Sequence, residues 1–249
     1  MLEIKELSAR VGGKAFLQNI CLHLPKGTFT ALVGRNGSGK STLLGCIGGV
    51  KAYSGDILLC GEDLRRLSLR RRAKRMALLP QTLAAPHITA EELASLGRNP
   101  YVDLARRFTA ADREAVSRAM EKAGVAELRD RFVDELSGGE RQRAYLAMIL
   151  AQETELLLLD EPTTHMDAAC GDGFLRSLAA LRQQGKTLLV VMHDLTDAVR
   201  YADRIAVMDG GRVVFDGSME ECLAGDVLEK TLRVKRYEAE GRSFFAAAE

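Results

Sequence analysis

Residues 34–42 read GRNGSGKST, and this stretch decides the fold class. It matches a phosphate-binding loop, with Gly34, four residues, then Gly39, Lys40 and Ser41, between an apolar strand-like run and an apolar helical segment. Glycines allow a tight turn that directs N–H groups at phosphate oxygens, a lysine adds a point charge, and a serine hydroxyl can bind Mg²⁺. The loop therefore predicts an α/β protein that binds the phosphates of a nucleotide. The predicted contacts are Gly34, Arg35, Asn36, Gly37, Ser38, Gly39, Lys40, Ser41 and Thr42.

Asp160 and Glu161 follow a run of four leucines at 156–159. A buried strand that ends in two carboxylates places them at the C-terminal edge of a parallel sheet, where such sheets bind ligands. Asp160 suits Mg²⁺ coordination through water, and Glu161 suits polarisation of a water for attack on a γ-phosphate. Taken alone, the two residues are equally well explained as solvated acids. The phosphate-binding loop upstream favours the catalytic interpretation.

Residues 136–140 read LSGGE and precede an apolar helix at 144–151. Ser137 and Glu140 have the spacing of a capping box, so Gly138 and Gly139 are expected in a first helical turn with exposed N–H groups. Such a positive helix end attracts an anion. Because the loop at 34–42 already holds this chain's phosphates, the second anion-binding helix end is expected to serve a γ-phosphate bound by another subunit. This predicts a head-to-tail homodimer.

The remaining pattern predicts one domain over 1–249. Thr89 with Glu92, and Thr109 before residues 110–123, predict two helix starts. We therefore expect an inserted helical lobe over about 84–152 between strand-rich flanks. Strands are expected around residues 2–4, 20–24, 29–33, 57–59, 77–79, 156–159 and 188–192, with a hairpin at 204–208 and 212–215 and a helix between residues 167 and 185.

The composition excludes several classes of protein. The 249 residues are 47% hydrophobic and 28% charged, which is typical of a globular protein. Lysine and arginine number 35 against 34 acidic residues, which argues against a surface built for nucleic acid. No apolar run approaches a membrane span, and the start MLEIKELSAR lacks the pattern of a secretory signal, so a cytosolic chain is expected. Five widely spaced cysteines are expected to be reduced thiols.

One basic run lies between residues 65 and 75. No aromatic residue interrupts it, so we interpret it as a solvated helix face rather than a nucleic-acid patch, with proximity to anionic lipid headgroups as a weaker alternative. It comprises Arg65, Arg66, Arg70, Arg71, Arg72, Lys74 and Arg75.

The motifs GRNGSGKST, LSGGERQR, LLLLDEPT and VMHD, in this order, resemble those of the ATPase subunits of ABC transporters. The resemblance covers essentially the whole chain. It implies a mostly parallel core sheet, an N-terminal antiparallel β subdomain and an inserted α-helical subdomain. It also implies ATP and Mg²⁺ as cofactors.

Several roles follow from the resemblance, position by position. Gln81 matches the glutamine that senses the γ-phosphate and Mg²⁺, and His193 matches the histidine that contacts the γ-phosphate. Asp167 matches the aspartate at the dimer interface, and it also suits a helix N-cap. The implied Mg²⁺ ligands are Ser41, Gln81 and Asp160, the implied catalytic residues are Glu161, His193 and Gln81, and the turn facing the partner's nucleotide is Ser137, Gly138, Gly139 and Glu140.

Two departures from the family pattern stand out. An aromatic residue that stacks on adenine is usual near Val11, where this chain reads RVGG. Either Phe16 substitutes or apolar contact alone holds the base, and both readings predict weak discrimination between ATP and GTP. The sequence His165, Met166, Asp167 is also unusual, and we attach no mechanism to it.

The stretches 89–101 and 193–217 resemble importers of iron chelates, haem and cobalamin. This implies membrane permease subunits docked near the Gln81 loop, an extracytoplasmic binding protein as an indirect partner, no nucleic acid, and a peripheral place on the cytoplasmic side of the cell membrane. Two alternatives are a soluble ABC-type ATPase acting on nucleic acid or ribosomes, and an importer of another substrate. A GTPase or small-molecule kinase would lack LSGGE. A non-hydrolysing regulatory subunit would lack part of the set that Lys40, Asp160, Glu161 and His193 complete.

Overall fold

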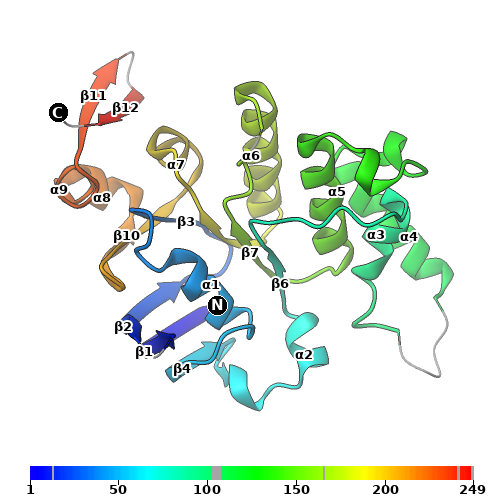
Figure 1. Cartoon of the computed structure of the whole chain (residues 1–249), viewed down its shortest axis with the longest axis horizontal. Helices are drawn as coiled ribbons and strands as arrows, with labels where there is room; N and C mark the ends of the chain where they lie inside the picture. The colour runs from blue at the N-terminus through cyan, green and yellow to red at the C-terminus, as the bar shows by residue number, and fades with distance from the viewer. Residues whose placement is uncertain (13, 103–107, 165, 240–241, 248–249) are drawn as a thin grey trace. The chain divides into compact units, whose positions relative to one another are not determined.

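The structure is a computed structural model that describes residues 1–12, 14–102, 108–164, 166–239 and 242–247. The chain divides into two compact units, Met1–Arg66 with Arg182–Glu249, and Leu67–Leu181. Each unit has its own strands and helices, most of which Figure 1 labels. The prediction of one domain over 1–249 with a helical lobe over about 84–152 stays a prediction.

An antiparallel sheet opens the first unit, with strand order β2-β1-β4-β5. In β1 (Leu2–Val11), the side chains of Leu2, Ile4 and Leu7 are buried. The register shifts between Ile4 and Leu7, where Glu6 has a φ of +51°, and this bulge turns Leu7 rather than Glu6 toward the core. The other strands of this sheet are β2 (Lys14–Leu24), β4 (Ser54–Leu59) and β5 (Glu62–Asp63).

The same unit contains a second group of strands, centred on β3 (Phe29–Gly34). β3 lies parallel to β8 (Thr187–Val191) and to β9 (Arg204–Asp209), and β10 (Arg212–Ser218) returns antiparallel to β9. All five residues of β8 are buried, which explains its unbroken apolar sequence. The phosphate-binding loop follows β3 and leads into α1 (Lys40–Ile47).

Short elements complete the first unit. A 3-10 turn at Leu64–Arg66 follows β5, and α7 (Leu195–Tyr201) follows β8. After β10 come α8 (Met219–Ala224), α9 (Val227–Leu232) and a hairpin of β11 (Val234–Ala239) with β12 (Arg242–Ala247). Figure 1 shows this hairpin at the C-terminal end, next to α9.

The second unit is built around two parallel strands, β6 (Met76–Leu79) and β7 (Leu156–Asp160). Between them the chain forms a group of packed helices (Figure 1). These are α3 (Ala90–Leu96), α4 (Ala110–Lys122) and α5 (Gly138–Ala151), with 3-10 turns at Ala126–Leu128 and Val133–Glu135. The short helix α2 (Leu69–Ala73) precedes β6, and α6 (Ala168–Gln183) follows β7, its last two residues belonging to the first unit.

Most local predictions are confirmed. Capping boxes open α3 at Thr89, α4 at Thr109 and α5 at Ser137. The β9–β10 hairpin turns through Gly210 and Gly211, which both have positive φ. All five cysteines are free thiols. No helix in the described part of the chain combines the length and apolar character that crossing a bilayer requires.

The interpretation of the basic run as a solvated helix face is confirmed only for Arg70, Arg71 and Arg72, which lie in α2, a helix without buried residues. Within the basic run, only residues 69–73 form an α-helix. Several of its cations form hydrogen bonds to other groups of the protein. Arg65 donates to Asp63 and Asp56, whose carboxylates flank it in the first unit. In the second unit, Arg70 Nε donates to the Pro100 carbonyl at 2.8 Å, and Arg72 Nε donates to the Leu67 carbonyl at 3.3 Å. Arg65, Arg70 and Arg72 therefore form hydrogen bonds within the protein.

Candidate functional site

The backbone conformation of the phosphate-binding loop requires glycine at three positions. Gly37 and Gly39 have φ values of +80° and +106°, in the left-handed region that other residues rarely adopt. Gly34 is required by space, because a Cβ there would lie 2.4 Å from the Met208 carbonyl oxygen. No side chain caps α1, and its first turn contains no acidic residue. The positive end of this helix is therefore left for an anion.

Lys40 and Ser38 fit that anion. Lys40 is buried, and its Nζ donates to the Gly34 carbonyl at 2.8 Å and to the Arg35 carbonyl at 3.2 Å. The ammonium group is thus held inside the loop. The Ser38 hydroxyl oxygen is buried and has no hydrogen-bond partner within the described residues. A buried hydroxyl of this kind is satisfied when a phosphate oxygen enters the loop.

His193 belongs to the same unit. It lies just beyond β8, and its side chain is exposed. The next residue, Asp194, caps α7 by accepting hydrogen bonds from the N–H groups of Thr196 at 2.7 Å and Asp197 at 3.2 Å. This cap fixes the turn in which His193 stands.

The second unit contains the other candidate residues. Asp160 ends β7 and is buried, with 8% of its surface exposed. Glu161 follows with a φ of +50°, and its carboxylate Oε2 accepts a hydrogen bond from Gln81 Nε2 at 2.5 Å. The predicted catalytic carboxylate and the predicted phosphate-sensing amide therefore meet directly. The motifs predict both residues but not this contact, because the sequence of neither strand shows that β6 and β7 are neighbours in the sheet.

In the turn at residues 137–139, Ser137 and Gly138 are exposed and Gly139 is partly exposed, as the shared-site hypothesis requires. The Glu140 N–H donates to Ser137 Oγ at 3.4 Å, while the Ser137 hydroxyl and N–H donate to the Glu140 carboxylate at 2.7 and 2.9 Å. The bonds from Ser137 lower the pKa of Glu140 below its ordinary value. Gly138 and Gln81 line one hollow of about 360 Å³ in this unit.

Asp167 is exposed in part and caps α6, as predicted. Its Oδ1 accepts a hydrogen bond from the Cys170 N–H at 2.8 Å. That bond lowers the pKa of the Asp167 carboxyl below its ordinary value. The helix cap explains Asp167 locally, and its role at a dimer interface stays a prediction. His165 lies outside the described residues.

A model of the ABC transporter family matches residues 17–164. This chain belongs to the ABC transporter family. It is 39% identical over 229 residues to the ferric enterobactin transport ATP-binding protein FepC of Escherichia coli K12, which covers 91% of this chain and 84% of that protein. It is also 39% identical over 236 residues to the hemin import ATP-binding protein HmuV of Pseudomonas fluorescens, covering 92% and 91% respectively.

The fold predicted from the ABC motifs is confirmed as well. The structure of the dimeric bacterial ABC transporter cassette MJ0796 superposes with a TM-score of 0.78 at 26% identity, covering 88% of this chain and 99% of that one. The resemblance inferred from the motifs is thus correct for the family and for the architecture.

One feature of this ABC protein concerns the nucleotide base. The side chain of Val11 lies outside the described residues. Phe16 is partly exposed, and its ring atom Cε1 lies 3.8 Å from the position that a Cβ would take on Gly39. The Gln18 N–H donates to the Gly211 carbonyl, and the Gly211 N–H to the Ser38 carbonyl, so β2, the β9–β10 turn and the loop are linked. This brings Phe16 beside the phosphate-binding loop.

Proposed function

We propose that this chain is the ATP-hydrolysing subunit of an ABC importer that carries iron-siderophore complexes, haem or cobalamin. The relatives named above, which transport ferric enterobactin or import hemin, support iron-siderophore complexes and haem as substrates. The phosphate-binding loop, the two carboxylates after β7 and the exposed turn of α5 support ATP hydrolysis. The chain acts on the cytoplasmic side of the membrane, docked by its Gln81 loop to permease subunits, with an extracytoplasmic binding protein delivering the substrate.

The catalytic site is shared between two copies of the chain. The observation that carries this proposal is that Ser137 and Gly138 are exposed, and Gly139 partly exposed, at a capped, positive helix end. In a head-to-tail homodimer this turn binds the γ-phosphate held by the partner's loop, and Asp167 lies at the interface. The charge that develops in the transition state is then stabilised from both chains.

Residues of this chain supply positioning and proton transfer. Lys40 and the loop amides hold the β- and γ-phosphates, and His193 contacts the γ-phosphate. Glu161 accepts the proton of the attacking water, in the orientation that its bond to Gln81 gives it. Bound with ATP, Mg²⁺ would neutralise phosphate charge, and the oxygens of Ser41, Gln81 and Asp160 are donors of the kind it prefers.

The variant Glu161→Gln tests the shared site. It keeps the shape of the side chain but removes the base, so we expect hydrolysis to fall about 100-fold or more while ATP-bound dimers accumulate. Light scattering with and without ATP measures the dimer. As a matched control, Glu155→Gln changes an exposed acid just before the other end of β7 and should leave hydrolysis unchanged. A Glu161→Gln protein that stays monomeric in saturating ATP would contradict the proposal.

The substrate is tested by purifying the chain with its native membrane partners and identifying the ligand of the co-purified binding protein. An iron-siderophore, haem or cobalamin supports the assignment. A sugar, peptide or amino acid would leave the ATPase in place and overturn the substrate class.

A further inference from the structure

Arg98 and Asp112 form an ion pair inside the helical part of the second unit. Their side chains are 7% and 0% exposed, and Arg98 Nε lies 3.1 Å from Asp112 Oδ1. Asp112 also closes the capping box of α4, where its Oδ2 accepts hydrogen bonds from the Thr109 N–H at 3.0 Å and the Thr109 hydroxyl at 2.6 Å. None of the predicted ATP-site residues takes part in these contacts.

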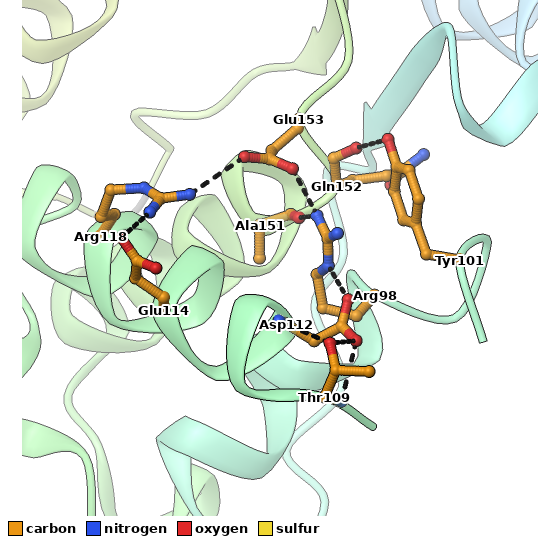
Figure 2. Close-up of polar contacts among 9 residues, drawn as sticks. All are labelled: Arg98, Tyr101, Thr109, Asp112, Glu114, Arg118, Ala151, Gln152 and Glu153. Carbon is orange, nitrogen blue, oxygen red and sulfur yellow. Dashed lines mark hydrogen bonds and ion pairs between the residues drawn. The ribbon is translucent and has the colours of Figure 1, made fainter. Parts of the chain in front are cut away.

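Arg98 joins three helix ends, as Figure 2 shows. It lies just after α3, it bonds to the first turn of α4, and its Nη1 donates at 2.7 Å both to the carbonyl of Ala151, the last residue of α5, and to the Glu153 carboxylate. The guanidinium also lies over the Tyr101 ring, 4.0 Å from its centroid. A cation at the C-terminal end of a helix is favourable because it faces unpaired carbonyl groups.

The C-terminal part of α5 is in close contact with α3 and with the start of β6. A Cβ at Gly97 would lie 2.1 Å from the Met148 carbonyl oxygen, so the end of α3 lies directly against the backbone of α5. After α5, Gln152 Nε2 donates to the carbonyls of Ala73 and, at 3.0 Å, Met76, which begins β6. The C-terminal end of α5 is thus tied to α3, α4 and β6.

Stability alone is a poor reason for a buried ion pair. Its desolvation costs several kcal/mol per charge, and well-packed apolar residues in its place are often no less stable. Hydrogen bonds from an arginine fix the relative orientation of the groups they join, because the acceptors must lie in the plane of the guanidinium group. The pair therefore fixes the direction of α5, whose 14 residues span about 20 Å to the Ser137 turn.

We propose that Arg98 is a positioning residue for ATP hydrolysis, which aims the Ser137–Gly139 turn at the partner's nucleotide by locking the far end of α5. The proposal rests on the shared site described above. Since α5 is a rigid rod, a small rotation at Ala151 displaces the turn at its other end. Displacements near 1 Å at a reacting group cost about 100-fold in rate.

The test uses Arg98→Met together with Asp112→Asn, which removes both charges and leaves neither buried alone, while the amide oxygen can still cap α4. We expect ATP to bind the chain's own loop as tightly as before, because that loop lies in the other unit. Hydrolysis should fall about tenfold or more. In the Glu161→Gln background, the ATP-bound dimer should weaken, and hydrogen exchange of the amides at 138–141 should speed up.

Arg118→Met is the matched control. Arg118 bonds to the same Glu153 and to Glu114 but is 48% exposed, so its loss should leave all three measurements unchanged. Arg98→Lys keeps the charge beside Asp112 and should give intermediate values in these measurements. If the double variant does not fold, the same measurements on Arg98→Lys test the proposal. Unchanged exchange at 138–141 and an unchanged dimer overturn the proposal. If the Glu161→Gln parent itself fails to dimerise, the shared site fails, and the exchange measurement still tests whether Arg98 orders the turn.

Discussion

Glu161, the proposed catalytic base, has a strained backbone conformation. Its φ of +50° is in the left-handed region, which costs a residue other than glycine about 1–2 kcal/mol. The Thr164 N–H donates to the Glu161 carbonyl at 3.2 Å, and Gln81 holds its carboxylate, so the surroundings maintain the strained conformation. The left-handed backbone of Glu161 is thus accompanied by a carboxylate held against Gln81.

The position of Phe16 beside the phosphate-binding loop predicts how the protein discriminates between nucleotide bases. A phenyl ring stacks on any base and makes no hydrogen bond that could distinguish one base from another. We therefore expect ATP and GTP to compete with affinities that differ by less than about tenfold. The chain contains no tryptophan, so Phe16→Trp would supply a unique fluorescent reporter.

Fluorescence of the Phe16→Trp protein should be quenched by ATP and by GTP, but not by inorganic tripolyphosphate, which fills the loop without a base. Phe244→Trp, on the exposed C-terminal hairpin, is the control and should respond to none of them. If ATP leaves the Phe16→Trp signal unchanged, or wins the competition with GTP by more than about tenfold, base stacking by this residue is wrong.

At the scale of elements, the N-terminal end of α5 has two uses. Its capping box stabilises the helix, and the same box places Gly138, which is exposed, and Gly139, which is partly exposed, in the first helical turn. Hydrogen bonds from Ser137 lower the pKa of Glu140. A carboxyl group whose pKa is lower in the folded state stabilises the fold above its ordinary pKa, and that contribution is lost as the pH falls through the lowered value.

The variant Glu140→Gln tests this cap. Its free energy of unfolding should be lower than that of the wild type by about 0.3–1 kcal/mol at pH 7, the usual range for a charge at a helix N-terminus. The difference should shrink as the pH falls below 4.5, the ordinary pKa, and vanish below the lowered one. Urea unfolding at a series of pH values measures it. Glu135→Gln, in the 3-10 turn before α5 and outside the capping box, is the control for loss of a nearby acid. A pH-independent gap for Glu140→Gln would refute the assignment.

Elements with a strong local signal could be predicted, and the others could not. The helices α3, α4 and α5 begin at Thr or Ser followed three residues later by an acid, so their starts are encoded locally. Short helices such as α7 have too few turns to show a 3.6-residue period, and the hairpin of β11 and β12 exposes Tyr237 and Phe244 without a buried face to reveal it. The start of α8 is encoded in the same way, by the capping box of Ser218 and Glu221.

The candidate site shows the same limit. Its residues are named by motif, but their contacts depend on strand neighbours. Gln81 reaches Glu161 because Leu79 lies opposite Leu159 in the parallel pair of β6 and β7, so the residues beyond both strand ends emerge together. The contacts of Arg98 were equally hidden, since its three acceptors, Asp112, Ala151 and Glu153, are distant from it in sequence.

At the scale of the whole molecule, a site divided between two copies has a consequence that no single-chain site shares: two different inactive variants can complement each other. Lys40→Ala removes the charge that holds the phosphates in its own chain. Gly139→Asp places a carboxylate in the turn that we propose binds the partner's phosphate. The structure has room for it, since the nearest atom to a Cβ there is Arg143 Nη1 at 3.9 Å, and an acid in the first turn suits the helix dipole.

Each variant alone should hydrolyse almost no ATP. Mixed in equal amounts, half of the dimers are hybrids, and each hybrid contains one site in which an intact loop meets an intact turn. We therefore expect the mixture to regain about a quarter of the wild-type rate, because both chains use the same interface. Gly173→Asp, at an exposed helical glycine with nothing within 4 Å of a Cβ, should be active by itself and shows that the substitution is tolerated. A mixture no more active than its two components would mean that each chain completes its own site, and that the exposed serine-glycine turn serves some other anion.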